Sequence, residues 1–210
     1  MYIINREYFQ DERLIANLNG TNGDVLIRLE KLIDRVCRET LRDALGIVEF
    51  TELNGFILPN GNLSPDAPVK WQNFVNGKTY TDGRYWIGLI QTYGTAKESL
   101  LADLVYSKWL QMEQTKQSGV GESVVLPKNA IIVDAKPKIV NYYNKFVGAY
   151  QGYICPEHIG RTMLYNGVPF TDWLGTEYDN AKQMTLVDYL REEFTNIEPR
   201  MYEFKDRFFN

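Results

Sequence analysis

The sequence contains few of the side chains that usually carry catalysis or bind metals. It has one histidine, His158, and two cysteines, Cys37 and Cys155, in 210 residues. Two distant cysteines do not make a disulfide framework, and their number fits a reducing, cytosolic environment. Cys155 and His158 supply two zinc ligands at most, because no second pair lies near them to complete four. We therefore predict no metal and no cofactor.

Basic charge is also scarce. Lys and Arg number 23 against 27 Asp and Glu, which gives a net charge of −4. A protein that grips nucleic acid needs a basic face, so tight nucleic-acid binding is disfavoured. No apolar run approaches the ~20 residues of a membrane-spanning helix, and the first residues lack the pattern of a secretory signal. We expect no membrane partner.

Apolar and aromatic side chains are plentiful. Apolar residues make up 44% of the chain, and the aromatics include 14 Tyr and 10 Phe. This composition is sufficient for a packed core and excludes wholesale disorder. Tyrosine also builds contact surfaces, since its ring is apolar and its hydroxyl is polar.

Apolar residues recur at helical spacing in several segments. The clearest stripe runs from Val25 to Leu45, with Asp24 as its cap and Gly46 as its expected stop. The predicted fold class is mainly α: a small helical bundle with short β-hairpins and an extended loop, plus a less regular α+β C-terminal extension. Residues 1–152 form the helical body, and 153–210 form the extension, with one helix and an aromatic tail. Further helices are predicted at about 69–76, 95–117, 137–152 and 184–194.

Short β-prone segments separate these helices. Residues 47–58 are rich in β-formers. The Asp-Gly pair at 82–83 predicts a hairpin. Residues 123–126 and 130–133 are two short apolar runs that indicate another hairpin or an extended loop.

No constellation typical of an enzyme is evident, and we predict no enzymatic activity. A Ser–His pair would need His158 as its base, and no G-x-S-x-G motif occurs. The Gly-Val-Gly at 119–121 follows a helix rather than a strand, so it indicates a flexible loop and not a phosphate cradle. An enzymatic alternative would require Glu157, His158 and Arg161 to cluster in a deep pocket.

Two segments are predicted to contact other subunits. Residues 117–133 begin with small residues and continue with β-prone runs, which either add to a neighbour's sheet edge or form a hairpin on their own core. In the tail, 199–210, aromatic and charged residues alternate as in a strand with one buried face. The tail either folds back on its own chain or docks on another subunit, because an exposed aromatic end would be a liability. The predicted contact residues are Gly119, Val120, Gly121, Val124, Val125, Leu126, Ile131, Ile132, Tyr202, Phe204, Phe208 and Phe209.

The order of these elements resembles a known family. The chain is similar in layout to small helical proteins encoded among the structural genes of tailed phages and prophages of Bacteroidota, including crAss-like phages. Those proteins are in turn similar to head–tail connector (adaptor, or neck ring) proteins. The resemblance covers roughly residues 20–150. The segments that carry it are Val25–Gly46, Trp71–Tyr80, Gly88-Leu89 leading into Leu101–Leu110, Gln114–Val124, Asn129 and Tyr143–Val147.

The resemblance implies a structural protein of the virion, made in the host cytoplasm and located at the head–tail junction. Such proteins form a ring, commonly a dodecamer, which joins the DNA-filled head to the tail. The implied partners are further copies of the chain, the portal protein and the next neck or tail ring protein, with DNA passing through the channel without tight binding. An alternative function is a tail or baseplate accessory, or a binding module that recognises glycan or protein through its aromatic residues.

Overall fold

The structure is a computed structural model that describes residues 3–16, 18, 23–94, 96–114, 116–118, 121–123, 135–152, 164–165, 168–169, 182–195 and 197–205. The described residues are mainly helical with short β-hairpins, which confirms the predicted fold class. The helices are α1 (Asp24–Gly55), α2 (Val69–Asn76), α3 (Leu100–Gln114), α4 (Lys136–Gln151) and α5 (Leu186–Glu193), preceded by the 3-10 turns η1 (Arg6–Tyr8) and η2 (Asp11–Arg13). The strands are β1 (Lys78–Thr79), β2 (Arg84–Trp86), β3 (Gln91–Tyr93), β4 (Ala96–Glu98), β5 (Lys116–Ser118), β6 (Gly121–Ser123), β7 (Leu164–Tyr165), β8 (Val168–Pro169) and β9 (Lys182–Gln183).

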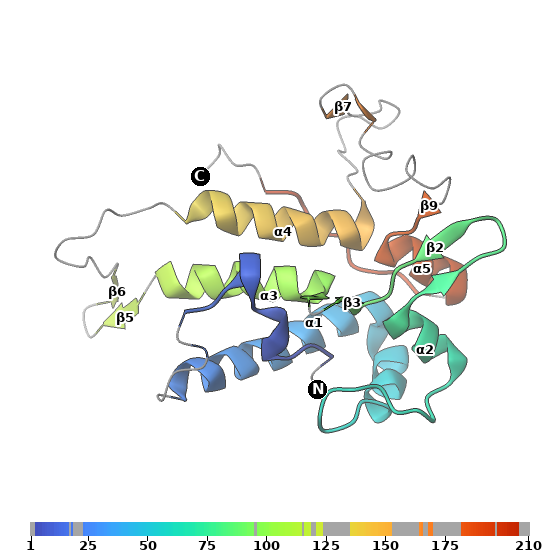
Figure 1. The fold of residues 1–210 in the computed structure, drawn as a ribbon, viewed down its shortest axis with the longest axis horizontal. Coiled ribbons are helices and arrows are strands. Elements are labelled where there is room, and N and C mark those ends of the chain that lie inside the picture. The colour runs from blue at the N-terminus through green and yellow to red at the C-terminus, as the bar shows by residue number, and fades with distance from the viewer. Residues whose placement is uncertain are drawn as a thin grey trace.

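Three long helices form the body of the molecule. Figure 1 shows α3 between α1 and α4, with α2 and α5 gathered at one end. The α3–α4 contact is close enough for the Ser107 hydroxyl to donate to the Ile139 carbonyl at 3.0 Å. No helix in the described ranges has both the length and the apolar character that a bilayer crossing requires.

Helix α1 contains a break where the sequence predicts its end. Gly46 has φ +73° and ψ 168°, a conformation that favours glycine and interrupts the helix. The chain then resumes as a helix to Gly55, so the prediction of a β-rich segment after Gly46 was wrong. Phe50 and Leu53 are buried at helical spacing, and the Thr51 hydroxyl donates to the Ile47 carbonyl at 2.7 Å. Packing on a helical face therefore outweighs the β propensity of this segment.

The end of the molecule near α2 and α5 is an aromatic cluster beside a small sheet. The hairpin predicted at 82–83 is confirmed, since β1 pairs antiparallel with β2. Strand β9 adds to β2 in parallel, which no sequence pattern indicated. Rings from α2, β2 and α5 pack together against this sheet. The cluster comprises Trp71, Phe74, Trp86, Tyr189 and Phe194, with centroid separations of 5.4–6.4 Å.

Helix α3 is shorter than the predicted 95–117. Residues 91–98 instead form the β3–β4 hairpin, and the Ser99 hydroxyl accepts a hydrogen bond from the Leu101 amide at 3.2 Å. This contact caps the helix just before its apolar stripe begins at Leu100. After Gln114 the chain forms the β5–β6 hairpin, which includes Ser123 of the predicted run 123–126. The rest of that run and the run 130–133 lie outside the described residues.

The remaining helices agree with the sequence, and the C-terminal residues join the same core. Helices α4 and α5 lie within one or two residues of their predicted bounds. A capping box between Thr185 and Asp188 fixes the start of α5. In the predicted extension 153–210, α5 and the tail residues Tyr202 and Phe204 pack against the core built by the body.

Candidate functional site

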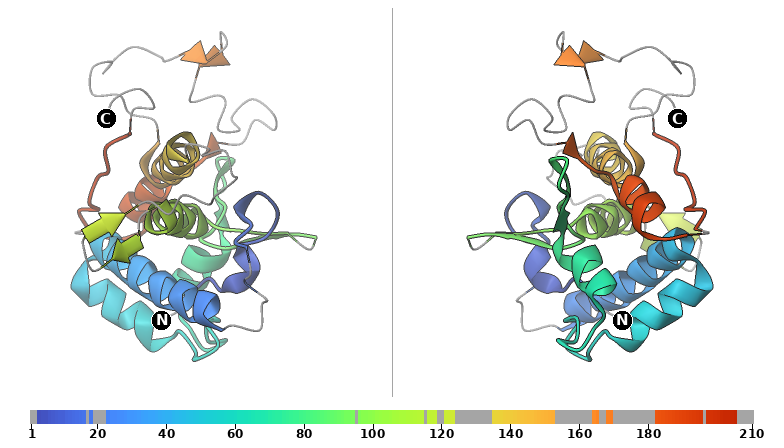
Figure 2. Two further views of the ribbon diagram at one scale, coloured as in Figure 1. Left: turned by 90° about the vertical axis from the view of Figure 1, so that its left-hand side faces the viewer. Right: turned by 90° about the vertical axis from the view of Figure 1, so that its right-hand side faces the viewer.

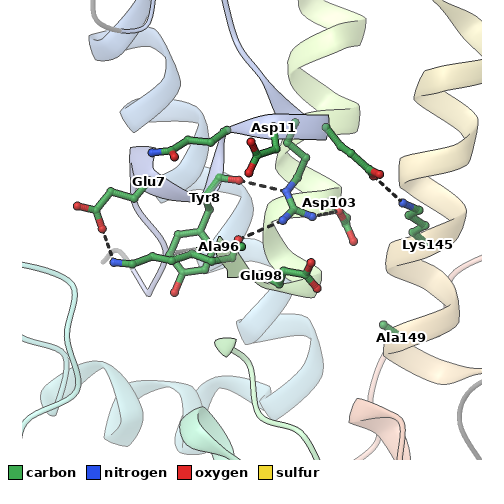
Figure 3. A pocket seen from close by; sticks show the side chains of 12 residues that line it. Glu7, Tyr8, Asp11, Ala96, Glu98, Asp103, Lys145 and Ala149 are labelled. Atoms are coloured by element: carbon green, nitrogen blue, oxygen red, sulfur yellow. Dashed lines mark hydrogen bonds and ion pairs between the residues drawn. The ribbon is translucent and has the colours of Figure 1, made fainter. Parts of the chain in front are cut away.

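A cavity opens where the N-terminal segment meets the helical body. It has a volume of about 310 Å³ and lies among η1, η2, β4, α3 and α4 (Figure 3). Its lining is strongly charged, and carboxylates outnumber cations. The charged lining residues are Glu7, Asp11, Glu12, Arg13, Lys97, Glu98, Asp103 and Lys145.

Arg13 joins the walls of this cavity. Its Nη1 donates to Asp103 Oδ1 at 2.8 Å, and its Nε and Nη2 each donate at 3.1 Å to the carbonyls of Tyr8 and Lys97. The side chains of Arg13 and Asp103 are each only 15% exposed. One guanidinium therefore ties η2 to η1, β4 and α3. Moving it toward a ligand would break all of these contacts at once.

Asp103 is the titratable group in this cavity whose pKa departs most clearly from its ordinary value. Burial raises the pKa of its carboxyl to about 6, and the neighbouring Arg13 opposes the rise. A carboxyl that titrates near neutral pH can serve as a general base, but structural ion pairs also shift pKa values. Because Arg13 holds Oδ1 of this carboxylate, the pair acts as a structural joint.

The other charges in the cavity pair across its walls. Lys145 Nζ lies 3.5 Å from Glu12 Oε2, and Lys97 pairs with Glu7. Within the described ranges no group of three or more His, Cys, Asp or Glu side chains is placed to hold a metal ion. The arrangement can fasten the N-terminal segment to α3 and α4, and it offers no set of metal ligands.

The aromatic tail lies along α4 of its own chain. Tyr202 and Phe204 are half-buried, whereas Met201, Glu203 and Lys205 between and beside them are exposed. The Tyr202 ring meets Phe146 edge-on at a centroid distance of 5.1 Å. This alternation matches the predicted buried face, although residues 197–205 form no strand.

Two side-chain amides on α4 hold the backbone of this tail. Gln151 donates to the Tyr202 carbonyl and accepts from the Tyr202 amide, both at 2.7 Å. Asn144 makes the same pair of contacts with Lys205, at 2.8 and 3.0 Å. We call Asn144 and Gln151 the amide clamp.

The predicted subunit-contact residues fall into three groups. Tyr202 and Phe204 pack on their own chain. Gly121 is in β6, where it pairs with Ser118 of the same molecule. The other residues lie outside the described residues: Gly119, Val120, Val124, Val125, Leu126, Ile131, Ile132, Phe208 and Phe209.

The two alternative functions, an enzyme and a binding module that uses aromatic residues, each depend on particular side chains. Glu157, His158 and Arg161 lie outside the described residues. Three of the four tryptophans are described, and all three are buried, so they cannot form an exposed stacking surface. These three are Trp71, Trp86 and Trp109.

Sequence reasoning missed both polar joints. Arg13 and Asp103 are 90 residues apart, and neither lies in a sequence motif that predicts an ion pair. Asn144 and Gln151 are seven residues apart on a predicted helix, a spacing that places both on one face. That spacing is the one available signal, and it does not reveal what the amides hold.

Comparisons of the chain with protein-family models, with curated proteins and with solved structures give no match.

Proposed function

We propose that the chain is a structural subunit of a ring at the neck of a tailed phage, where the DNA-filled head joins the tail. The observation that supports this most directly is a helical body from which two-stranded hairpins project. The β3–β4 hairpin extends from the body as an arm (Figure 2), and the β5–β6 hairpin lies beyond the end of α3 (Figure 1).

Such hairpins suit contacts between copies. A two-stranded sheet presents unpaired backbone groups along its outer edges, and a neighbour can add a strand to such an edge. The proposed contact segment 117–133 includes all of the β5–β6 hairpin but Lys116, and it continues through the apolar runs 123–126 and 130–133. The proposed partners are further copies of the chain, in a ring that is commonly a dodecamer, the portal protein and the next neck or tail ring.

The charges also suit a channel wall. The net charge is −4, and several described cations already pair with carboxylates inside the subunit, among them Arg13, Lys70 and Arg84. A wall without a strong basic surface does not accumulate phosphate contacts, so DNA slides past it. The alternative function, a binding module that uses exposed aromatics, gains no support from the three buried tryptophans.

Electron microscopy and native mass spectrometry of the purified chain, with and without its portal protein, test the proposal. We expect rings, and we expect them to disappear when residues 118–128 are deleted or when Val124, Val125 and Leu126 are all changed to Ser. The matched control changes Val48 and Val69 to Ser, since these exposed apolar residues lie outside the proposed contact segment. Rings from the deletion variant, or a chain that stays monomeric with the portal, would contradict the proposal.

A further inference from the structure

Asn144 and Gln151, with the Phe146 and Tyr150 rings between them, form the surface of α4 on which the tail lies, and we call this surface the groove. Asn144 and Gln151 are two helical turns apart, about 10 Å along α4. They pair with Lys205 and Tyr202, which are three residues apart on extended backbone and so span about the same distance. The tail therefore runs antiparallel to α4, in register with its amides. Each amide satisfies one backbone N–H and one C=O, as a neighbouring strand would.

Two further contacts select which residues enter the groove. The Tyr202 ring lies edge-on to Tyr150 at a centroid distance of 5.0 Å, as it does to Phe146. Arg200 donates from Nη1 to Asp43 Oδ2 and from its backbone amide to the Asp43 carbonyl, both at 3.1 Å. The groove thus fits an extended segment with a basic residue two positions before an aromatic one.

The contacts that hold the tail can open at modest cost. The tail is held by neutral hydrogen bonds, by the Arg200–Asp43 ion pair, whose arginine is exposed, and by one face of its side chains, while its other face is exposed. Beneath it, the Tyr150 hydroxyl is buried and has no hydrogen-bond partner in the part of the chain that the structure describes. A buried unpaired hydroxyl is unfavourable, and it would gain water when the tail leaves. Hydration of this hydroxyl therefore offsets part of the free energy that is lost when the tail contacts open.

We infer that this groove binds the tail of a second copy of the chain when copies assemble, so that neighbours exchange residues 200–205. Every contact listed above is made equally well by the same segment of another copy, and such exchange is a low-cost route to assembly. Residues 195–199 join Phe194, which is buried in the core, to Arg200, and exchange requires Ile197 to leave its contact with the core. These residues reach about 20 Å at most, so the neighbour's α4 must lie close to the end of α5. The inference rests on the proposed ring, since it needs adjacent copies.

Cross-linking between copies distinguishes exchange from an intramolecular tail. Lys205 Nζ lies 4.4 Å from the centroid of the Tyr143 ring, so cysteines at these two positions are adjacent whenever the groove is occupied. One chain carries Tyr143→Cys and a second carries Lys205→Cys, both in a Cys155→Ser background. Cys37 can stay, because it is buried and burial raises its thiol pKa to about 12. The two chains are mixed, assembled and treated with a short bis-maleimide.

We expect a covalent product of twice the chain mass of 24.4 kDa from the mixture. Adding Gln151→Ala to the Tyr143→Cys chain should lower its yield several-fold. A matched control places the cysteine at Lys145 instead of Tyr143, since Lys145 faces Glu12 and not the tail. A single chain that carries both cysteines reports the intramolecular tail.

The outcomes separate this inference from the proposed ring. Rings in which only the doubly substituted chain cross-links, within itself, overturn the exchange and leave the ring in place. Equal yields from the Tyr143→Cys and Lys145→Cys mixtures would also overturn it, because they indicate random proximity. The expected product without rings in the microscope supports exchange and contradicts the proposed ring.

Discussion

Beyond their apolar contacts with the core, the two ends of the chain are fastened to the helical body by different polar chemistry. The N-terminal segment is held by a charge, since Arg13 reaches the nearly buried Asp103 of α3 and two backbone carbonyls. The C-terminal tail is held by the neutral side-chain amides of Asn144 and Gln151 on α4, and the arginine of its ion pair, Arg200–Asp43, is exposed. Among the described residues of the two ends, 3–16 and 197–205, none pairs in a strand ladder.

The difference between a buried ion pair and neutral amide contacts determines how each end responds to substitution and to pH. A buried charge that loses its partner is left uncompensated, which is strongly unfavourable, and the pairing depends on pH. An amide that loses its backbone partner regains water if the site opens, and it does not titrate. The N-terminal attachment is therefore a permanent joint, and the C-terminal attachment is the one suited to exchange.

Removing the buried cation should have the largest effect. Arg13→Ala leaves the Asp103 carboxylate without its partner, and we expect it to lower the free energy of unfolding by about 3 kcal/mol. Urea denaturation at pH 7 measures this. The matched control is Arg200→Ala, which removes an arginine from the opposite end whose side chain is 68% exposed and whose ion pair contributes at most about 1 kcal/mol. Equal losses in the two variants would show that Arg13 does not serve as a joint.

The pH dependence of stability should also separate the ends. The pKa of Asp103 rises from 3.8 to about 6 on folding, so the folded state binds this proton more tightly. Asp103 therefore contributes stability that is fully present below about pH 4 and is lost as the pH rises through 6. Compared with Asp103→Asn, the wild-type chain should lose up to about 3 kcal/mol between pH 4 and pH 7. Parallel pH profiles of wild type and Asp103→Asn would contradict this assignment, while Gln151→Ala should leave the wild-type slope unchanged.

At the C-terminal end, the buried member of the amide clamp should matter more than the half-buried one. Gln151→Ala removes two hydrogen bonds to Tyr202, and we expect a loss of about 1–2 kcal/mol in the free energy of unfolding. Gln151→Glu keeps the acceptor for the Tyr202 amide but loses the donor, so it should not restore full stability. Urea denaturation compares the three chains. Wild-type stability in both variants would mean that the amides do not hold the tail.

The sequence predicted the helices well because their apolar stripes are long. Helix α2 was placed at its observed bounds, and α4 and α5 within two residues, since glycine, proline and periodic apolar residues mark them locally. The errors lie where tertiary packing overrides local preference. The chain after Gly46 is helical because Phe50 and Leu53 are buried against the core there. Local propensity carries no information about that tertiary contact.

The polar attachments could not be predicted for a related reason. The Arg13–Asp103 pair joins residues 90 apart, and only the fold brings them together. The buried face of the tail was visible as an alternation of aromatic and charged residues, but the sequence left open which chain it packs on. Whether Tyr202 enters its own groove or a neighbour's depends on the concentration of copies as well as on the contacts.

The smallest effect on stability should come from the half-buried member of the clamp, and it should still loosen the tail. Asn144 is hydrogen-bonded to Lys205 at the surface, where water competes, so Asn144→Ala should cost less than about 1 kcal/mol. Hydrogen exchange of a peptide covering residues 200–205 measures the local change, and we expect the Lys205 amide to exchange at least several-fold faster. The Tyr202 amide should stay protected, because Gln151 still holds it. If the backbone amides of Tyr202 and Lys205 lost protection together, the tail would open as one unit. The side chains of Asn144 and Gln151 would then act as a single cooperative clamp.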